Sequence, residues 1–164
     1  MKDYIKEKLL SYSSNEYMKK YIEICEFYQE KPCKTNKYNF HHIFPAFLYR
    51  QEHNAKNRNK IIDDLDKEYI PKDNIVKLPN KWHFIVHYFL GKALLTKEAI
   101  NSFQIFIGDF NKNINDYTLD EVKLLGQEYE DTSQPNTLNE YMTNKEKQKY
   151  YYQQYKEYMK SKKK

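Results

Sequence analysis

Two histidines on one side of an apolar helical stretch constrain the fold of this chain more than any other feature. His83 and His87 are four residues apart. The apolar residues around them recur at helical spacing: Trp82, Ile85, Val86, Phe89, Leu90, Ala93 and Leu94. This spacing predicts a helix over residues 82–95. Residues i and i+4 share one helix face, so the two imidazoles are expected to point at the same place.

Two further histidines, His41 and His42, lie in a segment that is typical of a β-strand. Residues 38–44 are rich in aromatic side chains and end at Pro45, and residues 75–78 predict a second, short strand. Side chains alternate across a strand, so one of the two histidines faces the helical pair and the other faces away. Three imidazoles around one point form a transition-metal site with an open position. The spacing leaves open which of the two is the ligand.

Three short pieces of this region carry a family resemblance. They are His41-His42-Ile43-Phe44-Pro45, Asp73-Asn74-Ile75-Val76 and His83-Phe84-Ile85-Val86-His87. The spacings from Asn74 to His83 and from His83 to His87 match colicin-type and phage-type members of the HNH (His-Asn-His) endonucleases, which have the ββα-metal fold. The chain therefore resembles that family. It departs from it in a longer loop after Pro45 and in Trp82, where phage-type members often have Glu.

The resemblance implies a metal-dependent DNA endonuclease and a role for each motif residue. His41, His83 and His87 would hold one divalent metal ion (Zn, Mg, Mn or Ni), which would polarise the scissile phosphate and neutralise the leaving 3′-oxygen. His42 would be the general base, because histidine titrates near neutral pH. Asn74 would hold the His42 backbone in place by a hydrogen bond rather than bind the metal. Small members of the family are often encoded by phages or mobile elements, so the resemblance implies a nuclease of that type.

Other assignments of these histidines meet specific objections. Zinc metalloproteases with a helical His-x-x-x-His pattern need Glu after the first His, and this chain has Phe84 there. Only Cys25 and Cys33 occur, so the extra four-cysteine zinc site of some HNH proteins is excluded. The alternative function is a DNA-binding module that a metal holds together and that does not cleave DNA. The presence of both His42 and Asn74 argues against it, since a structural site needs neither.

Basic residues predict two places where DNA is bound. The net charge is +5, and residues 138–164 account for it with eight Lys and three Glu. This segment is also rich in Tyr, so it either binds phosphates and stacks bases or covers the core or a partner with its tyrosines. The loop 49–72 carries the other candidates, which are Arg50, Lys56, Arg58 and Lys60. Arginine grips phosphate bidentately, whereas scattered charge in a loop is often only solvated.

The whole pattern predicts an α+β protein that is mostly helical, with a small ββα-metal hairpin-helix core. Its expected parts are flanking helices in 2–30, the ββα-metal motif at about 38–95, flanking helices in 97–129, a linker at 131–136 and a basic, Tyr- and Lys-rich helix at 137–164. The parts before the linker form one nuclease domain, residues 1–130. Capping boxes of the Ser/Thr-x-x-Glu type predict helix starts at residues 13–16, 118–121 and 137–140.

Composition also bears on where the protein acts. No apolar segment approaches membrane-spanning length, and residues 1–10 lack the apolar core of a signal peptide. The two cysteines form no Cys-x-x-Cys pair, which fits a reducing compartment. These features predict a cytoplasmic protein that does not act in a membrane. The sequence does not indicate an oligomeric state.

Overall fold

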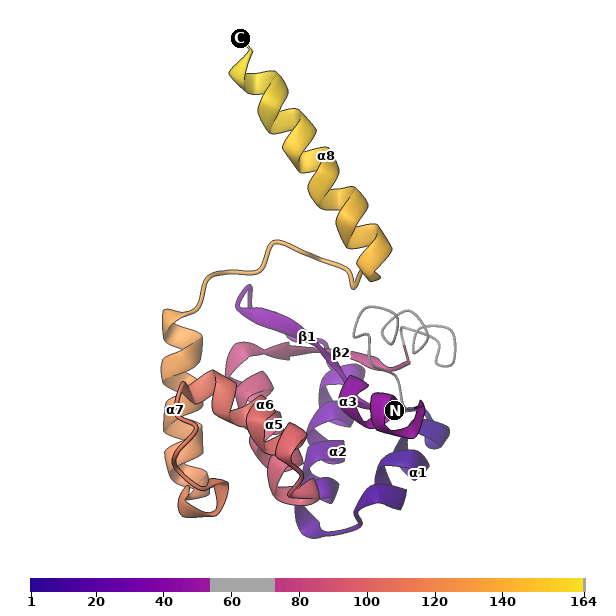
Figure 1. Ribbon diagram of the computed structural model, residues 1–164, viewed down its shortest axis with the longest axis vertical. Coiled ribbons are helices and arrows are strands. Elements are labelled where there is room, and N and C mark those ends of the chain that lie inside the picture. Colours follow the sequence, from indigo (N-terminus) through magenta and orange to yellow (C-terminus); the bar gives the residue numbers. More distant parts are fainter. Residues whose placement is uncertain (54–72, 164) are drawn as a thin grey trace.

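The computed structural model describes residues 1–53 and 73–163, which form a mostly helical protein with one small sheet (Figure 1). The elements in chain order are α1 (Asp3–Tyr12), α2 (Glu16–Glu30), β1 (Tyr38–His42), α3 (Ala46–His53), β2 (Ile75–Pro79), α5 (Asn80–Leu94), α6 (Lys97–Ile107), the short 3₁₀ helix η1 (Ile114–Asp116), α7 (Leu119–Thr132) and α8 (Asn144–Lys162). The predicted α+β, mostly helical class is therefore confirmed. In the part of the chain that is described, no helix is both long and apolar enough to cross a membrane.

The two strands pair antiparallel and bring distant segments of the chain together. In their register His41 lies opposite Val76 and His42 lies opposite Ile75. β1 ends at His42, two residues before the predicted end. The strand stops there because the amides of Ile43 and Phe44 both bond to Asn74, just before β2, and do not continue the ladder of paired strands.

Helix α5 lies at the centre of the body, packed against α2, α6, α7 and both strands (Figure 1). It is buried on most of its surface because its sequence is apolar around most of the helix. Helix α7 can approach it closely at Gly126. A methyl group there would lie 3.1 Å from the carbonyl oxygen of Lys81 and 3.3 Å from the ring of Phe84. The helix predicted from the histidine spacing is thus present, and it is the element around which the others pack.

Side-chain caps show where the helices begin, and they correct two of the three predicted starts. Thr118 accepts a hydrogen bond from the Glu121 amide and begins α7, as predicted. Helix α2 begins from Asn15 rather than from Ser13, because Ser13 lies at the end of α1. Helix α8 begins from Thr143, whose capping box with Glu146 is complete, and not at residues 137–140.

The predicted loop after Pro45 begins as a helix. In α3, Leu48 and Tyr49 are buried, so this helix belongs to the packed body. Arg50 is the next residue of α3. The other predicted nucleic-acid-binding residues, Lys56, Arg58 and Lys60, lie outside the described residues.

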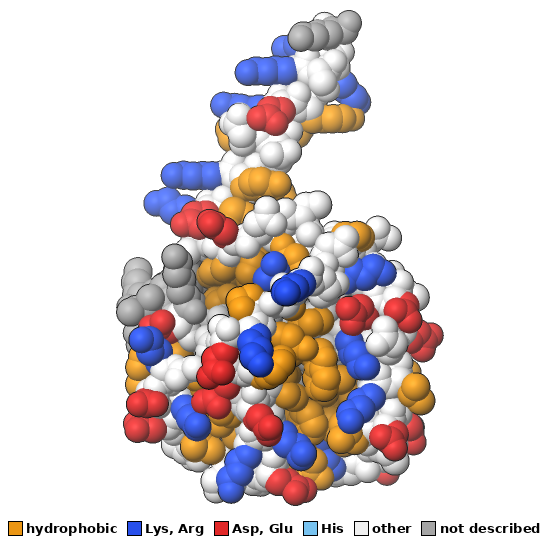
Figure 2. Space-filling view, turned by 180° about the vertical axis from the view of Figure 1, so that it is seen from behind, with side chains coloured by type: hydrophobic (Ala, Val, Ile, Leu, Met, Phe, Trp, Pro, Cys, Tyr) orange, Lys and Arg blue, Asp and Glu red, His pale blue; other side chains and the backbone are white. Residues whose placement is uncertain are grey.

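Helix α8 stands away from the body at the C-terminal end of the chain (Figure 1). Residues 133–143 connect it to α7, so the connection lies later in the chain than the predicted linker at 131–136. The side chains of residues 151–163 are all exposed. Seen from behind, lysine side chains project from this helix, with hydrophobic side chains between them (Figure 2). The exposure of these side chains argues against packing on the core, and it is compatible with binding either nucleic acid or a partner.

Candidate metal centre

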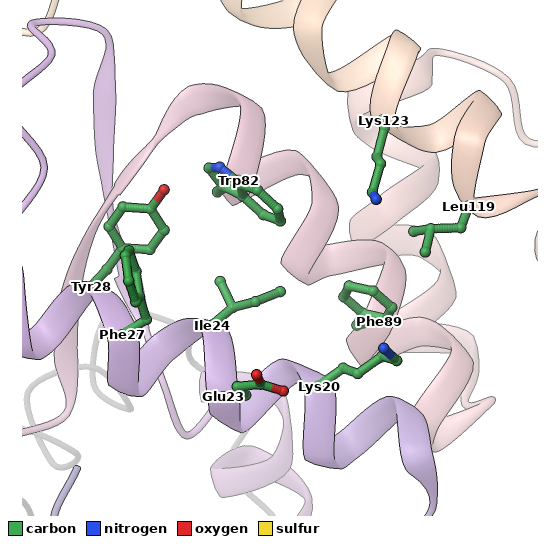
Figure 3. Close-up of a pocket in the computed structure, with 9 residues that line it drawn as sticks. All are labelled: Lys20, Glu23, Ile24, Phe27, Tyr28, Trp82, Phe89, Leu119 and Lys123. Carbon is green, nitrogen blue, oxygen red and sulfur yellow. The ribbon is translucent and has the colours of Figure 1, made fainter.

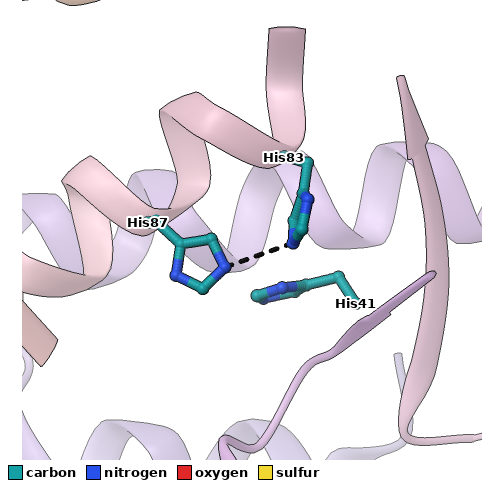
Figure 4. A group of neighbouring side chains, drawn as sticks. All are labelled: His41, His83 and His87. Atoms are coloured by element: carbon teal, nitrogen blue, oxygen red, sulfur yellow. Dashed lines mark hydrogen bonds between the residues drawn. The ribbon is translucent and has the colours of Figure 1, made fainter. Parts of the chain in front are cut away.

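Three imidazoles from two elements converge beside the sheet (Figure 4). His41 comes from β1, while His83 and His87 come from successive turns of α5, and one nitrogen of each ring lies within 4.8 Å of the others. The centroid of the His41 ring lies 5.3 Å from that of His83 and 5.0 Å from that of His87. The strand register thus turns His41 toward α5, and the structure brings together the three residues that the resemblance implied as ligands.

Tyr21 of α2 determines which nitrogen His41 can offer to an ion. The Tyr21 hydroxyl donates its proton to the carbonyl oxygen of Ile43 at 2.7 Å, and it lies 2.7 Å from Nε2 of His41. Burial raises the pKa of Tyr21 well above its usual value of 10, so the hydroxyl keeps that proton. Its oxygen can then only accept from His41, which places the imidazole proton on Nε2. The lone pair of His41 is therefore on Nδ1.

All three imidazoles are uncharged at neutral pH. Burial lowers the pKa of His83 from 6.5 to about 4. Burial also lowers the pKa values of His41 and His87 well below 6.5, and neighbouring imidazoles lower them further. Phe106 of α6 forms an apolar wall behind the helical pair, with its ring centroid 5.1 Å from that of His83 and 5.0 Å from that of His87. Neutral imidazole is the form that binds metals, so no proton has to leave first.

Two polar atoms of this cluster lack a hydrogen-bond partner among the described residues. Nδ1 of His83 and Nδ1 of His87 are buried, and neither has a hydrogen-bond partner among the described residues. Their Nε2 atoms lie 3.2 Å apart, a distance that one shared proton can bridge (dashed line in Figure 4). Nitrogens bound at about 2 Å to a tetrahedral ion lie roughly 3.3 Å apart, so the same two atoms are also spaced to hold a metal. The spacing of the Nε2 atoms therefore fits a metal ion, and an ion held there leaves the two Nδ1 atoms without a partner among the described residues.

The cluster opens into a cavity of about 530 Å³ that is also lined by His42. Arg50 of α3 lies on its wall, and Glu98, Asn101 and Ser102 of α6 line it as well. A closed structural metal site has no such space beside its ligands. The arrangement leaves room for a water molecule and a phosphate group next to the three imidazoles.

His42 projects from the face of β1 opposite to His41, as strand alternation predicts. Its Nε2 lies 3.1 Å from the hydroxyl oxygen of Tyr141, in the connection to α8. The two rings are nearly perpendicular, at 89°, with their centroids 5.5 Å apart. His42 is therefore separate from the three-imidazole cluster but faces the same cavity.

Asn74 holds the turn that follows β1. Its Oδ1 accepts the amide of Phe44 at 2.8 Å, and its Nδ2 donates to the carbonyl oxygen of Phe44 at 3.3 Å. Its backbone carbonyl accepts the amide of Ile43 at 2.9 Å. The resemblance implied a bond to the backbone of His42. The side chain instead bonds to Phe44, and Asn74 fixes the chain just after His42.

A second hollow, of about 320 Å³, lies between α2, α5 and α7 (Figure 3). Its lining is largely apolar, with Ile24, Phe27 and Phe89 among the residues, and it contains no histidine. Trp82, which stands where phage-type HNH proteins often have Glu, also lines this hollow and not the histidine cavity. The departure from the family pattern thus has a packing role in this chain.

Three aromatic residues of the site could not be predicted from the sequence. Tyr21 contacts His41, Phe106 contacts the two helical histidines, and Tyr141 contacts His42. Apolar periodicity indicates that Tyr21 and Phe106 lie on buried helix faces, but it does not name the neighbour. For Tyr141 no local pattern exists, because 99 residues separate it from His42.

Comparison of the chain with protein-family models, with curated proteins and with solved structures found no match.

Proposed function

We propose that this chain is a metal-dependent DNA endonuclease of the HNH type, with a ββα-metal centre formed by β1, β2 and α5. One observation carries the proposal. Three uncharged imidazoles converge at one point on the wall of an open cavity, with a fourth histidine and an arginine on the same wall. Hydrolysis of a phosphodiester needs this combination of a bound ion, a base and space for water and substrate.

Each residue has a distinct part in the proposed reaction. His41 would hold the ion through Nδ1, and His83 and His87 through Nε2. An all-imidazole donor set favours Zn or Ni over Mg or Mn. The bound ion supplies positive charge that stabilises the phosphate and the leaving 3′-oxygen. His42 takes the proton of the attacking water, and Arg50 holds a phosphate oxygen with its guanidinium group.

The charge distribution supports DNA as the substrate. Arg50 brings a cation to the cavity wall. Four exposed lysines of α8 fall on one face by helical spacing, and these are Lys145, Lys149, Lys156 and Lys160. Phosphate contacts by such side chains release counterions and give an affinity that does not depend on base sequence. The cavity would thus hold the scissile phosphate, and α8 would add affinity for neighbouring DNA.

A plasmid-nicking assay with metal-free protein supplied with Mg²⁺, Mn²⁺, Ni²⁺ or Zn²⁺ tests the proposal. We expect cleavage with at least one ion and none in excess chelator. His42→Ala should lower the rate by about 10²–10⁴ while metal binding is kept, because a general base is not a ligand. His53→Ala is the matched control, since it removes a histidine that has no proposed role.

Two results would change the assignment. If His42→Ala loses the metal, the roles of His41 and His42 are exchanged. The other result is DNA binding without cleavage in the presence of any of the four ions, together with a melting temperature that chelator lowers. That result would identify the protein as the metal-held DNA-binding module instead.

A further inference from the structure

The connection between α7 and α8, residues 133–143, is tied to the sheet by hydrogen bonds. The amide of Asn136 donates to the carbonyl oxygen of Asn36 at 2.7 Å, and its side-chain Nδ2 donates to the carbonyl oxygen of Tyr38 at 3.2 Å. Tyr38 is the first residue of β1, and Asn36 lies two residues before it. The connection is therefore anchored beside the strand that carries His41 and His42, and it is more than a spacer.

Tyr141 is the residue through which this connection reaches the proposed base. Its hydroxyl oxygen lies 3.1 Å from Nε2 of His42, and its ring meets the His42 ring edge to face. The same ring meets that of Phe40 at 72°, with centroids 6.1 Å apart. Phe40 and His42 share one face of β1 because they are two residues apart. Tyr141 thus packs on that face with its ring and contacts the imidazole with its hydroxyl.

We propose that Tyr141 is a positioning residue for His42 and accepts the proton on Nε2. The inference rests on the proposed function, in which His42 is the base. Neutral imidazole has one N–H group and one lone pair. If the hydroxyl accepts from Nε2, the lone pair is on Nδ1 and can take a proton from water. If the hydroxyl donated to Nε2 instead, it would occupy the lone pair, and a base held in that way would be masked.

The neighbouring histidine also has a tyrosine hydroxyl beside its Nε2. Tyr21 contacts Nε2 of His41 from the core side, and Tyr141 contacts Nε2 of His42 from the other side of the strand. The Tyr21 hydroxyl donates to Ile43 and so accepts from His41, and in the proposal the Tyr141 hydroxyl accepts from His42 in the same way, which leaves the lone pair of each imidazole on Nδ1. Holding an imidazole in one tautomer and one orientation is the usual contribution of such a hydrogen-bond partner.

The test compares Tyr141→Phe, which removes the hydroxyl and keeps the ring, with Tyr17→Phe, which alters a half-buried tyrosine of α2 outside the cavity. In the nicking assay we expect kcat of Tyr141→Phe to fall by about tenfold or more, because part of the contribution of the base is lost. The KM for plasmid, the metal affinity and the melting temperature of Tyr141→Phe should stay at the wild-type values. In Tyr17→Phe these three quantities and kcat should all be unchanged. A rise in kcat would show that the hydroxyl masks the base. An unchanged kcat would show that the contact has no function, and either result overturns the proposal.

Nuclear magnetic resonance of the imidazole nitrogens gives a readout that does not need activity. We expect the His42 proton on Nε2 in the wild type and a mixture of tautomers in Tyr141→Phe. A proton on Nδ1 in the wild type would refute the positioning role even if the protein cleaves DNA. If the expected tautomer is found but no ion supports cleavage, the endonuclease function fails while the action of Tyr141 on His42 stands.

Discussion

The histidine cluster and helix α8 both show regular helical spacing in the sequence, yet only the cluster is organised by burial. His83 and His87 face His41 across a packed interface, and Phe106 lies against both. The tyrosines and lysines of α8 are spaced as regularly but face solvent. Periodicity thus decides which side chains share a face. The neighbours decide whether that face becomes a site of fixed geometry or a surface for a partner.

The two regions also differ in what their polar groups require. A buried imidazole nitrogen needs a partner, and two in the cluster have none among the described residues. An exposed lysine is satisfied by water. A buried polar group without a partner costs free energy, whereas an exposed lysine does not, so the cluster should be far more sensitive to substitution than α8.

The largest expected contrast is between single substitutions in the two regions. His83→Ala or His87→Ala should remove the stabilisation by metal, about 3–4 kcal/mol at ion concentrations 100 to 1,000 times the dissociation constant. Tyr155→Ala on α8, where the side chain is 58% exposed, should change the free energy of unfolding by less than about 0.5 kcal/mol. Thermal unfolding with and without chelator measures both. Similar losses of stability in the two regions would show that the cluster is not held by metal and burial as described.

The pH dependence of the metal-free protein is the next largest effect. The pKa of His83 is about 4 in the folded state against 6.5 for the free side chain, so between these values only the unfolded chain binds the proton. Stability should be complete above pH 6.5, fall as the pH decreases toward about 4 and then level off. At about 1.4 kcal/mol per pKa unit, His83 alone contributes on the order of 3 kcal/mol, and His41 and His87 act in the same direction.

Denaturant unfolding in chelator, from pH 7 to pH 4, measures this effect. Removal of residues 144–164 is the control, because the slope should survive the loss of α8. A flat profile would mean that the imidazoles are not buried as the structure has them.

The smallest effects concern DNA, and they separate the cavity from α8. Removal of residues 144–164 takes away eight lysines and leaves Tyr141 in place. Binding should weaken and depend less on salt, while kcat at saturating DNA stays near the wild-type value. Arg50→Ala should instead lower kcat by about tenfold with little change in salt dependence, since positioning at the scissile phosphate is lost. Arg50→Lys keeps the charge without the planar fork and should recover only part of the rate. A fall in kcat on removal of α8 would contradict this division.

Much of the fold follows from local patterns, because its central elements are strongly periodic. The helix that carries His83 and His87 and the strand that carries His41 were both predicted within a few residues. Capping boxes were less informative. Thr118 begins a helix, but Ser13 lies at the end of one. A four-residue pattern cannot show which of several nearby polar residues will take the cap.

The site was predictable only in part. Strand alternation showed that one of His41 and His42 faces the helix, but not which. That choice is made by the register and by Tyr21, whose contacts lie 20 and 22 residues away in the chain. The contact between Tyr141 and His42 has no sequence pattern at all. It follows from hydrogen bonds that anchor the connection to α8 beside β1.

Metal titration tests whether His41, His83 and His87 hold one ion. Chelated protein is titrated at pH 7 with Co²⁺, whose visible absorption reports the coordination, and then with Zn²⁺ in competition. We expect saturation at one ion per chain, displacement by Zn²⁺, and loss of the spectrum in His41→Ala, His83→Ala and His87→Ala but not in His42→Ala. No saturable binding, or binding that survives all three ligand substitutions, would contradict it.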